Sequence, residues 1–310
     1  MLAHYVVRMK VAIVFNGKAG TLDRAKCQER ANEILAACKE RGIDAEAHMC
    51  EGARLTPTAR ELAARGDLDA VIAAGGDGTV SAVAQGVLGS NVTMGVIPLG
   101  TLNHFAKDLG VPEINIALDT IARGETKNVD VGEVNGRVFI NNSSIGLYPE
   151  VVVDRDAQRK QIGRGKWSAM LLAAWRILVR FPLLHVAIAL AGNVFSARTP
   201  IIFVGNNEYE VNVRSLGKRQ RLDGGKLAIY TMRATSRLRM LWVALKQILQ
   251  RGNPPELEAH QVDRADIVTN KRTLKVALDG EVLRMKPPLT YKSRPGALRV
   301  FFPAAVEVAS

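Results

Sequence analysis

The sequence predicts an N-terminal α/β domain with a parallel sheet over residues 1–127 and an antiparallel β domain over residues 128–293. Through about residue 125, short apolar runs alternate with helix-length stretches, which is the pattern of a parallel sheet covered by helices. After that point extended segments follow one another, with Asn-Gly and Asp-Gly pairs where hairpin turns are expected. A chain of 310 residues, 47% of them hydrophobic, also holds enough apolar material for two domain cores.

The elements of the first domain follow from its apolar runs and the polar, glycine-containing stretches between them. The predicted strands are 10–15, 44–49, 70–74 and 92–97, and the predicted helices are a stretch running from Leu22 through Cys38, then 56–65, 79–88 and 101–109.

The second domain consists of predicted strands joined by turns. The strands are 128–134, 137–143, 184–190, 194–204, 226–232 and a series within 256–302; the turns are 135–136, 192–193 and 279–280. Two helical insertions, 166–180 and 236–251, carry Trp and Leu beside Arg and Lys. The last segment, about 294–310, is expected to pack back onto the first domain.

The net charge of +12 favours an anionic partner, which could be nucleic acid, a nucleotide or an anionic bilayer. Aromatic residues make up only 5% of the chain, and no basic segment interleaves them as a base-stacking surface requires. We therefore expect no nucleic-acid partner.

Cysteine usage and the apolar stretches indicate a cytoplasmic protein. The three cysteines, Cys27, Cys38 and Cys50, have no metal-binding spacing and are expected to be reduced. The N-terminus lacks the features of a signal peptide. The most apolar stretch, 169–191, is broken by charged residues and Pro182, so it is not expected to span a membrane.

A glycine-rich motif follows the buried strand 70–74. Gly75-Gly76-Asp77-Gly78-Thr79 leads from that strand into a helix, where backbone N–H groups can approach a phosphate. Asp77 could order a magnesium–phosphate unit, and Thr79 could cap the helix and touch phosphate. The alternative is an ordinary glycine-rich turn.

Two further polar loops end neighbouring strands of the same predicted sheet. Residues 98–106, Pro-Leu-Gly-Thr-Leu-Asn-His-Phe-Ala, follow the strand 92–97, and residues 16–20, Asn-Gly-Lys-Ala-Gly, follow the first strand. Because ligands of parallel sheets bind beyond the carboxyl ends of the strands, three such loops predict one nucleotide site.

These motifs resemble the diacylglycerol kinase catalytic-domain family, which includes bacterial lipid kinases and the sphingosine and ceramide kinases. The similar segments are 16–20, 75–79, 98–103, Asp130 within Val-Asp-Val-Gly, 139–146, 222–225 and 278–281. The second of them alone is shared with NAD kinases, whereas the ordered set is specific. The resemblance implies a Rossmann-like nucleotide domain, a C-terminal antiparallel β-sandwich that binds lipid, and a site to which both contribute.

The resemblance also implies roles for individual residues. Glu281 matches the general base that takes the proton of the lipid hydroxyl, although an exposed Glu after a hairpin turn is its plainer interpretation. Asp77 and Asp130 match carboxylates of the magnesium and water network, and Asp130 could equally be a surface Asp at a strand end. Asp223, with the carbonyls of Gln220 and Gly225, matches a structural magnesium site; a simple Asp-Gly-Gly turn is the alternative.

The cofactors implied are ATP and Mg²⁺. The expected nucleotide-binding residues are Asn16, Gly17, Lys18, Ala19, Gly20, Gly75, Gly76, Asp77, Gly78, Thr79, Gly100, Thr101, Asn103 and His104.

The sequence departs from the family pattern at two places. His104 stands where many relatives have Asp, so it could donate to a phosphate or merely cap the helix. Ser81-Ala82 replaces an Asn-Glu pair, which removes a polar contact near the nucleotide.

The function expected from the resemblance is ATP-dependent phosphorylation of a lipid hydroxyl, with diacylglycerol as the default acceptor. A sphingoid base, monoacylglycerol or phosphatidylglycerol, an NAD kinase relative and a sensor without catalysis remain alternatives. The basic, Trp-containing insertion 155–180 could rest on the inner membrane face or pack on the β domain, and a homodimer is left open.

Overall fold

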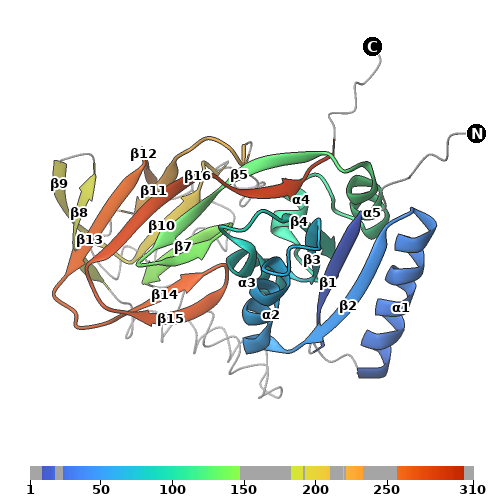
Figure 1. Ribbon diagram of the computed structural model, residues 1–310. Coiled ribbons are helices and arrows are strands. Elements are labelled where there is room, and N and C mark those ends of the chain that lie inside the picture. The colour runs from blue at the N-terminus through green and yellow to red at the C-terminus, as the bar shows by residue number, and fades with distance from the viewer. Residues whose placement is uncertain are drawn as a thin grey trace, which may run out of the picture. The chain divides into compact units, whose positions relative to one another are not determined.

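Figure 1 shows the computed structural model of the protein. It describes residues 9–17, 24–146, 183–190, 193–209, 219, 221–232 and 257–303. Outside these ranges lie both predicted helical insertions, the predicted turn residue Gly192, the predicted nucleotide residues Lys18, Ala19 and Gly20, and the predicted metal ligand Gln220.

The chain divides into two compact units. The first comprises residues 1–131, 218–223 and 295–310, and the second comprises 132–217 and 224–294. Strands β5 (Thr126–Val134) and β16 (Leu289–Phe301) each contribute residues to both units.

The first unit is built on a parallel sheet in the order β2-β1-β3-β4. Its strands are β1 (Lys10–Asn16), β2 (Asp44–Cys50), β3 (Ala70–Gly75) and β4 (Thr93–Pro98). All residues of β3 and β4 are buried, as expected for central strands covered on both faces. Near its end β16 adds a parallel pairing to this sheet, Val300 with Met94.

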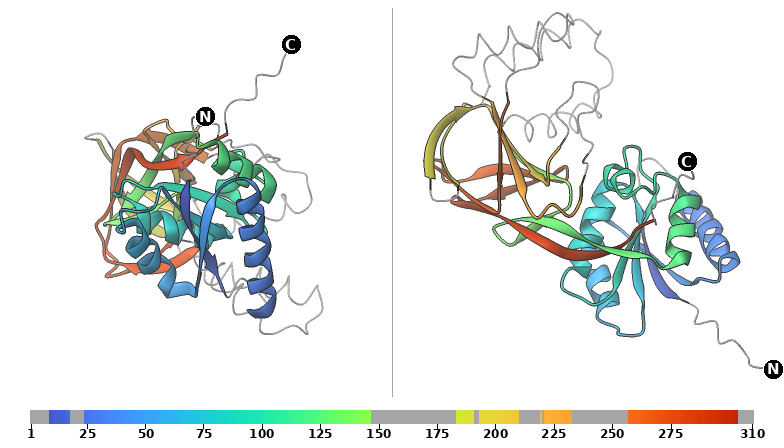
Figure 2. Two further views of the ribbon diagram at one scale, coloured as in Figure 1. Left: turned by 45° about the vertical axis from the view of Figure 1, so that its right-hand side comes forward. Right: turned by 90° about the horizontal axis from the view of Figure 1, so that it is seen from above.

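Helices cover both faces of this sheet (Figure 2). They are α1 (Arg24–Glu40), η1 (Gly52–Arg54), α2 (Leu55–Ala63), α3 (Asp77–Val87), α4 (His104–Asp108) and α5 (Ile114–Arg123). Ile34 of α1 and Leu118 of α5 share one apolar cluster with Ile13 and Ile72 of the sheet. Helices α2 and α3 pack against each other, with Gly86 of α3 against the backbone of α2.

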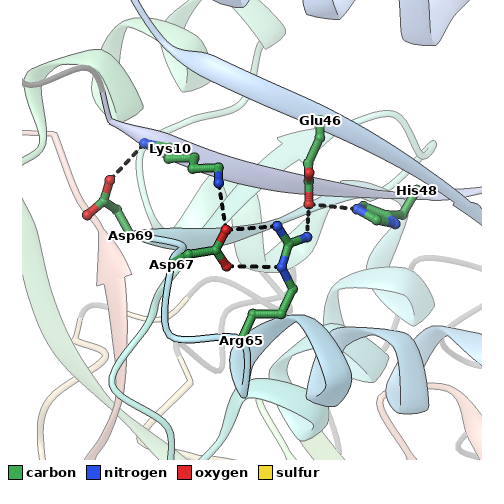
Figure 3. Close-up of polar contacts among 6 residues, drawn as sticks. All are labelled: Lys10, Glu46, His48, Arg65, Asp67 and Asp69. Carbon is green, nitrogen blue, oxygen red and sulfur yellow. Dashed lines mark hydrogen bonds and ion pairs between the residues drawn. The ribbon is translucent and has the colours of Figure 1, made fainter.

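A network of ion pairs ties the chain together beside β1 and β2 (Figure 3). Asp67, in the loop after α2, pairs with Lys10 at 2.6 Å and with Arg65 at 2.9 Å. Arg65 also pairs with Glu46 of β2, which accepts a 3.0 Å contact from His48. The network therefore joins β1, β2 and the loop that leads into β3.

The second unit contains two antiparallel sheets packed on a shared core. One has the order β12-β11-β10-β7-β14-β15; the other contains β9, β8, β13 and the first part of β16. The strands are β6 (Arg137–Phe139), β7 (Asn142–Gly146), β8 (Leu184–Leu190), β9 (Asn193–Thr199), β10 (Ile201–Asn206), β11 (Leu227–Met232), β12 (Leu257–Val262), β13 (Arg264–Thr269), β14 (Leu274–Leu278) and β15 (Glu281–Met285). Side chains of both sheets, including Ile188, Val204, Val276 and Tyr291, form one buried cluster.

The predicted fold class is confirmed, with differences in single elements. Helix α5 was not predicted. The predicted strand 137–143 is two strands, because the N–H groups of Ile140 and Asn141 bind the Asp279 carboxylate instead of a neighbouring strand. The predicted strand 194–204 also divides, at Pro200, which has no N–H to donate. No helix in the described part of the chain is long and apolar enough to cross a membrane.

Candidate active site

The glycine motif forms a sharp connection from β3 to α3. Gly75 is the last residue of β3, Gly76 precedes the helix and Asp77 is its first residue. A Cβ atom on Gly75 would collide with the side chain of Thr79, which is only 3% exposed. Glycine is therefore required at position 75 for the helix to begin directly at the end of the strand. Thr79 and Val80 donate their N–H groups to the Gly76 carbonyl, so the N–H groups of Asp77 and Gly78 are the ones at the start of α3 that can bind an anion.

The second loop meets the first at two glycines. A Cβ atom on Gly100 would lie 2.5 Å from the Cα atom of Gly76, and one on Gly76 would lie 3.3 Å from the Cα atom of Gly100. The N–H of Leu99 also donates to the carbonyl of Gly75 at 3.0 Å. The two strand ends are therefore in direct backbone contact, a packing that side chains at these positions would prevent.

Asn103 holds the second loop in shape. Its side-chain oxygen accepts the N–H of Gly100 at 3.0 Å, and its amide donates to the carbonyl of Gly100 at 2.9 Å. Asn103 has a φ of 49°, in the left-handed region that Asn tolerates better than most residues. Its side chain is thus engaged in the loop, which gives it a structural role that the sequence analysis did not anticipate.

The first loop reaches the same place through Asn16. The amide of Asn16 at the end of β1 lies 3.4 Å from the hydroxyl of Thr79. Gly17 donates its N–H to the carbonyl of Cys50 at 2.7 Å. The structure therefore brings Asn16, Gly75, Gly76, Thr79, Gly100 and Asn103 together at one edge of the sheet.

Asp77 stands at the N-terminus of α3 with one oxygen unsatisfied. Its Oδ1 atom is buried and makes no hydrogen bond with any described residue. A buried carboxylate oxygen without a partner is costly, and a cation or a water at the phosphate edge would satisfy it. Asp77 is therefore the residue of this loop best suited to meet a magnesium–nucleotide complex.

His104 is the exposed first residue of α4, and Thr101 in the loop before it is also exposed. Leu102 is 54% exposed, unusually so for a leucine. The predicted helix 101–109 begins only at His104, because residues 100–103 form the loop that Asn103 closes. Ser81 and Ala82 lie on α3, and Ala82 uses its carbonyl to accept the Thr56 hydroxyl at 2.9 Å.

A buried ion pair anchors α4. Arg219 donates through Nε to Asp108 at 2.8 Å, and its Nη2 lies 2.8 Å from the same carboxylate oxygen. The side chains are 0% and 5% exposed, and the guanidinium also stacks over Phe105 at 5.9 Å. Nothing in the motif pattern indicated this pair, because its members lie 111 positions apart.

Asp130 is buried in β5 and does not lie at a surface strand end. It is 2% exposed, and its Oδ1 accepts the N–H of Gly296 at 2.8 Å. Gly296 has a φ of 60°, so the carboxylate fixes a left-handed turn within β16. The alternative of a surface Asp is wrong, while its role in a magnesium and water network stays a prediction.

At the predicted structural magnesium site, the Asp223 carboxylate is paired with two basic side chains. Asp223 pairs through Oδ2 with Lys127 at 3.0 Å and through Oδ1 with Arg221 at 3.3 Å. Lys127, followed by Arg221, holds the pKa of the Asp223 carboxyl below its ordinary value. Both carboxylate oxygens are thus engaged by cations, and the role of Asp223 as a magnesium ligand stays a prediction. Among the described residues no group of three or more His, Cys, Asp and Glu side chains is arranged to hold a metal ion.

In the second unit, Asp279 organises the turn before Glu281. Its carboxylate accepts three backbone N–H groups, from Ile140 at 2.8 Å, Asn141 at 2.8 Å and Asn142 at 3.0 Å. Its own N–H donates to the carbonyl of Asn142 at 2.9 Å. The β14–β15 turn is thereby fastened to the corner between β6 and β7.

Glu281 follows this turn as the exposed first residue of β15. Asp279 and Gly280 have φ values of 46° and 89°, which is the two-residue hairpin predicted from the sequence. The position of Glu281 therefore depends on a turn that is fixed by four hydrogen bonds of Asp279. An Asp-Gly pair signals a turn, but it does not reveal that the Asp side chain also binds a distant corner.

Similar proteins are known. Residues 10–134 match the model of the diacylglycerol kinase catalytic domain. A diacylglycerol kinase of Bacillus subtilis (strain 168) is 28% identical over 288 residues, covering 90% of this chain and 91% of that protein. A diacylglycerol kinase of Staphylococcus aureus (strain MRSA252) is 28% identical over 222 residues, covering 71% and 69%. The crystal structure of a candidate diacylglycerol kinase from Bacillus anthracis str. Sterne aligns with a TM-score of 0.70 and 27% identity, covering 96% of this chain and 98% of that one.

Proposed function

The chain belongs to the diacylglycerol kinase catalytic-domain family, and from that premise we propose that it transfers the γ-phosphoryl group of ATP to the hydroxyl group of a lipid. The observation that carries the proposal is the backbone contact of Gly76 with Gly100, which brings two glycine loops to the start of α3. That arrangement leaves backbone N–H groups accessible to phosphate, and it supports a nucleotide as the phosphoryl donor.

The magnesium ion is proposed to arrive with the nucleotide as part of the substrate. Asp77 is the proposed protein ligand, because its buried Oδ1 has no other described partner. Magnesium would neutralise charge on the β- and γ-phosphates as the γ-phosphoryl group is transferred. The Asp223 site enters none of these steps, since its carboxylate is neutralised by Lys127 and Arg221.

Glu281 is proposed as the general base. As the lipid oxygen bonds to the γ-phosphorus, the bond from that phosphorus to the β,γ-bridging oxygen breaks and ADP leaves. The proton of the lipid hydroxyl passes to the Glu281 carboxylate. The Asp279 turn would keep Glu281 in one place, so that no conformational search precedes proton transfer.

Diacylglycerol is the proposed acceptor, and phosphatidic acid the product. The support is the name of the two relatives, each of which is called a diacylglycerol kinase. Because the lipid sits in a bilayer, the proposal includes peripheral contact with an anionic membrane surface, which the net charge of +12 favours.

The experiment that tests the proposal supplies [γ-³²P]ATP, magnesium and mixed micelles of diacylglycerol, and extracts the product into organic solvent. Labelled phosphatidic acid is expected from the wild type, with a loss of at least about a hundredfold in Asp77→Ala and in Glu281→Ala. Glu29→Ala removes an exposed acid of α1 and should change nothing.

The alternatives give different products in the same experiment. Label in a water-soluble dinucleotide, when NAD is supplied, would indicate an NAD kinase. Magnesium-dependent ATP binding without transfer to a panel of diacylglycerol, monoacylglycerol, sphingosine and phosphatidylglycerol would indicate a sensor, which the changes at Ser81, Ala82 and His104 keep as a second candidate. If both acidic variants retained full transfer, the assigned site would be wrong.

A further inference from the structure

The second unit contains a pocket at one end of the β14–β15 hairpin. Its volume is about 320 Å³, which lies in the range of sites for small molecules. Lys275 and Arg284, which line it, are register partners, and the pairing of Leu278 with Glu281 lies three residues further along the hairpin. At about 3.4 Å per residue, the pocket is thus roughly 10 Å from the proposed base.

The lining combines three aliphatic side chains with three cations. Ile145, Leu184 and Leu274 form the apolar part. Lys271, Lys275 and Arg284 supply the charge, and the described residues of the lining include no carboxylate. A pocket of this composition suits a ligand that is anionic at one end and apolar at the other.

The charges of this pocket are arranged at a cost to the fold. Lys275 lies directly opposite Arg284 across the hairpin, where like charges repel. Elsewhere in the chain surface cations are commonly paired, as Lys226 is with Asp263. The side chains of Lys271 and Arg284, in contrast, make no ion pair or hydrogen bond with any described residue. An anion beside Lys271 and Arg284 would give these two side chains the partner that they do not have among the described residues.

We infer that this pocket binds the phosphate group of one anionic phospholipid, with the first carbons of its chains against Leu184 and Leu274. Lysine and arginine are the side chains that proteins use for phosphate, and three of them match a phosphate better than a single carboxylate. The inference goes beyond the proposed kinase reaction and does not depend on it, because the pocket lies apart from Glu281 and requires no nucleotide. Such a lipid would hold the second unit at an anionic bilayer.

The test is calorimetric titration of the full chain, without nucleotide, with dihexanoyl phosphatidic acid below its micelle concentration. One molecule is expected to bind per chain. Lys271→Glu/Arg284→Glu should weaken binding at least about tenfold, because each Lys or Arg at an anionic lipid surface contributes about a fivefold factor. Arg198→Glu/Lys292→Glu, on other strands, is the control matched in net charge. Each reversal changes the net charge by two, so the net charge of both double variants falls from +12 to +8.

The outcomes separate the sources of phosphate. Weak binding of inorganic phosphate and of dihexanoyl phosphatidylcholine supports the inference, and Lys271→Arg/Arg284→Lys should retain the affinity of the wild type. Inorganic phosphate binding as tightly as the lipid would overturn the lipid assignment. An equal loss in the pocket variant and the control would overturn the site, since only net charge would then matter. Thermal unfolding of each variant verifies that it is folded.

Discussion

Replacing Arg219 by alanine should destabilise the first unit more than any nearby charge substitution. In the wild type Asp108 accepts two contacts of 2.8 Å from a guanidinium that is 0% exposed. Without Arg219, the Asp108 side chain, 5% exposed, remains as a buried charge that has lost its cation partner. Breaking a buried pair from one side costs about 3–5 kcal/mol, and the lost stacking on Phe105 adds to this.

That loss corresponds to a fall in melting temperature on the order of 6–20 °C for a unit of this size. The measurement is urea and thermal unfolding of the full chain, with hydrogen exchange of the α4 amides to assign the change to the first unit. Arg221→Ala is the matched control, because its partner is the same residue type but its side chain is 71% exposed; it should cost less than about 1 kcal/mol.

The double variant Arg219→Met/Asp108→Leu distinguishes the cost of leaving Asp108 unpaired from the contribution of the ion pair itself. Hydrophobic residues of similar size can replace a buried ion pair with little or no loss, so this variant should recover most of the stability. If Arg219→Ala and Arg221→Ala unfolded at the same midpoint, the buried pair would contribute nothing, and the reasoning would be refuted.

Three other predictions follow from single contacts. Gly100→Ala places a Cβ atom 2.5 Å from Gly76, so it should weaken ATP binding at least about tenfold in equilibrium titration. Gly89→Ala meets no atom within 4 Å but strains a residue with a φ of 81°, so it should lower stability and change ATP binding little. Asp279→Asn preserves the left-handed turn but removes the negative charge that accepts three backbone N–H groups. It should lower the free energy of unfolding by about 1.5–3 kcal/mol in urea titration. Unchanged stability would contradict the role of the Asp279 carboxylate in holding the corner. The pKa values of the Glu46 and Asp67 carboxyls lie below their ordinary 4.5 and 3.8. Their contribution to the free energy of unfolding is therefore present above that range and is lost as the pH falls through the lowered values. Acid unfolding of Glu46→Gln should depend less on pH between about 4.5 and 2 than that of the wild type, and an unchanged profile would exclude a role of the network in stability.

The sequence predicted the parts that depend on local pattern. The four parallel strands appear within two residues of their predicted limits, and β1 and β3 are short apolar runs ended by Asn16 and by the glycines at 75–76. The family resemblance is confirmed. It could be read from the sequence because close contacts fix the residue types of the loops that carry it, as at Gly75 and Gly100. Helix α5 was missed because its N-cap residue, Glu113, is not one of the Ser, Thr, Asp or Asn residues that signal a helix start.

What the sequence could not indicate are contacts between distant segments. Asp130 resembled a surface residue, yet it is buried because a turn 166 positions away uses its carboxylate. Asp223 matched a metal ligand or a simple turn residue, and nothing near it in the chain indicated that Lys127, from a different segment, pairs with its carboxylate. In both cases the residues next to the Asp in the sequence do not indicate its role. The residue that contacts the carboxylate in the folded protein comes from a distant segment.

Asp279 shows how two motifs that are far apart in the chain can act as one. The corner at Ile140–Asn142 has three N–H groups that no strand satisfies, and the hairpin at Asp279 supplies a carboxylate that accepts all three. Each segment is therefore incomplete without the other, because unpaired buried N–H groups are costly. Loss of the Asp279 carboxylate should consequently be felt at Glu281, two residues further along the chain, even though the two segments it joins are 139 positions apart. The role proposed for Glu281 would benefit from this arrangement, since the hydrogen bonds of Asp279 fix the start of β15 through backbone N–H groups that no side-chain change at the corner can remove.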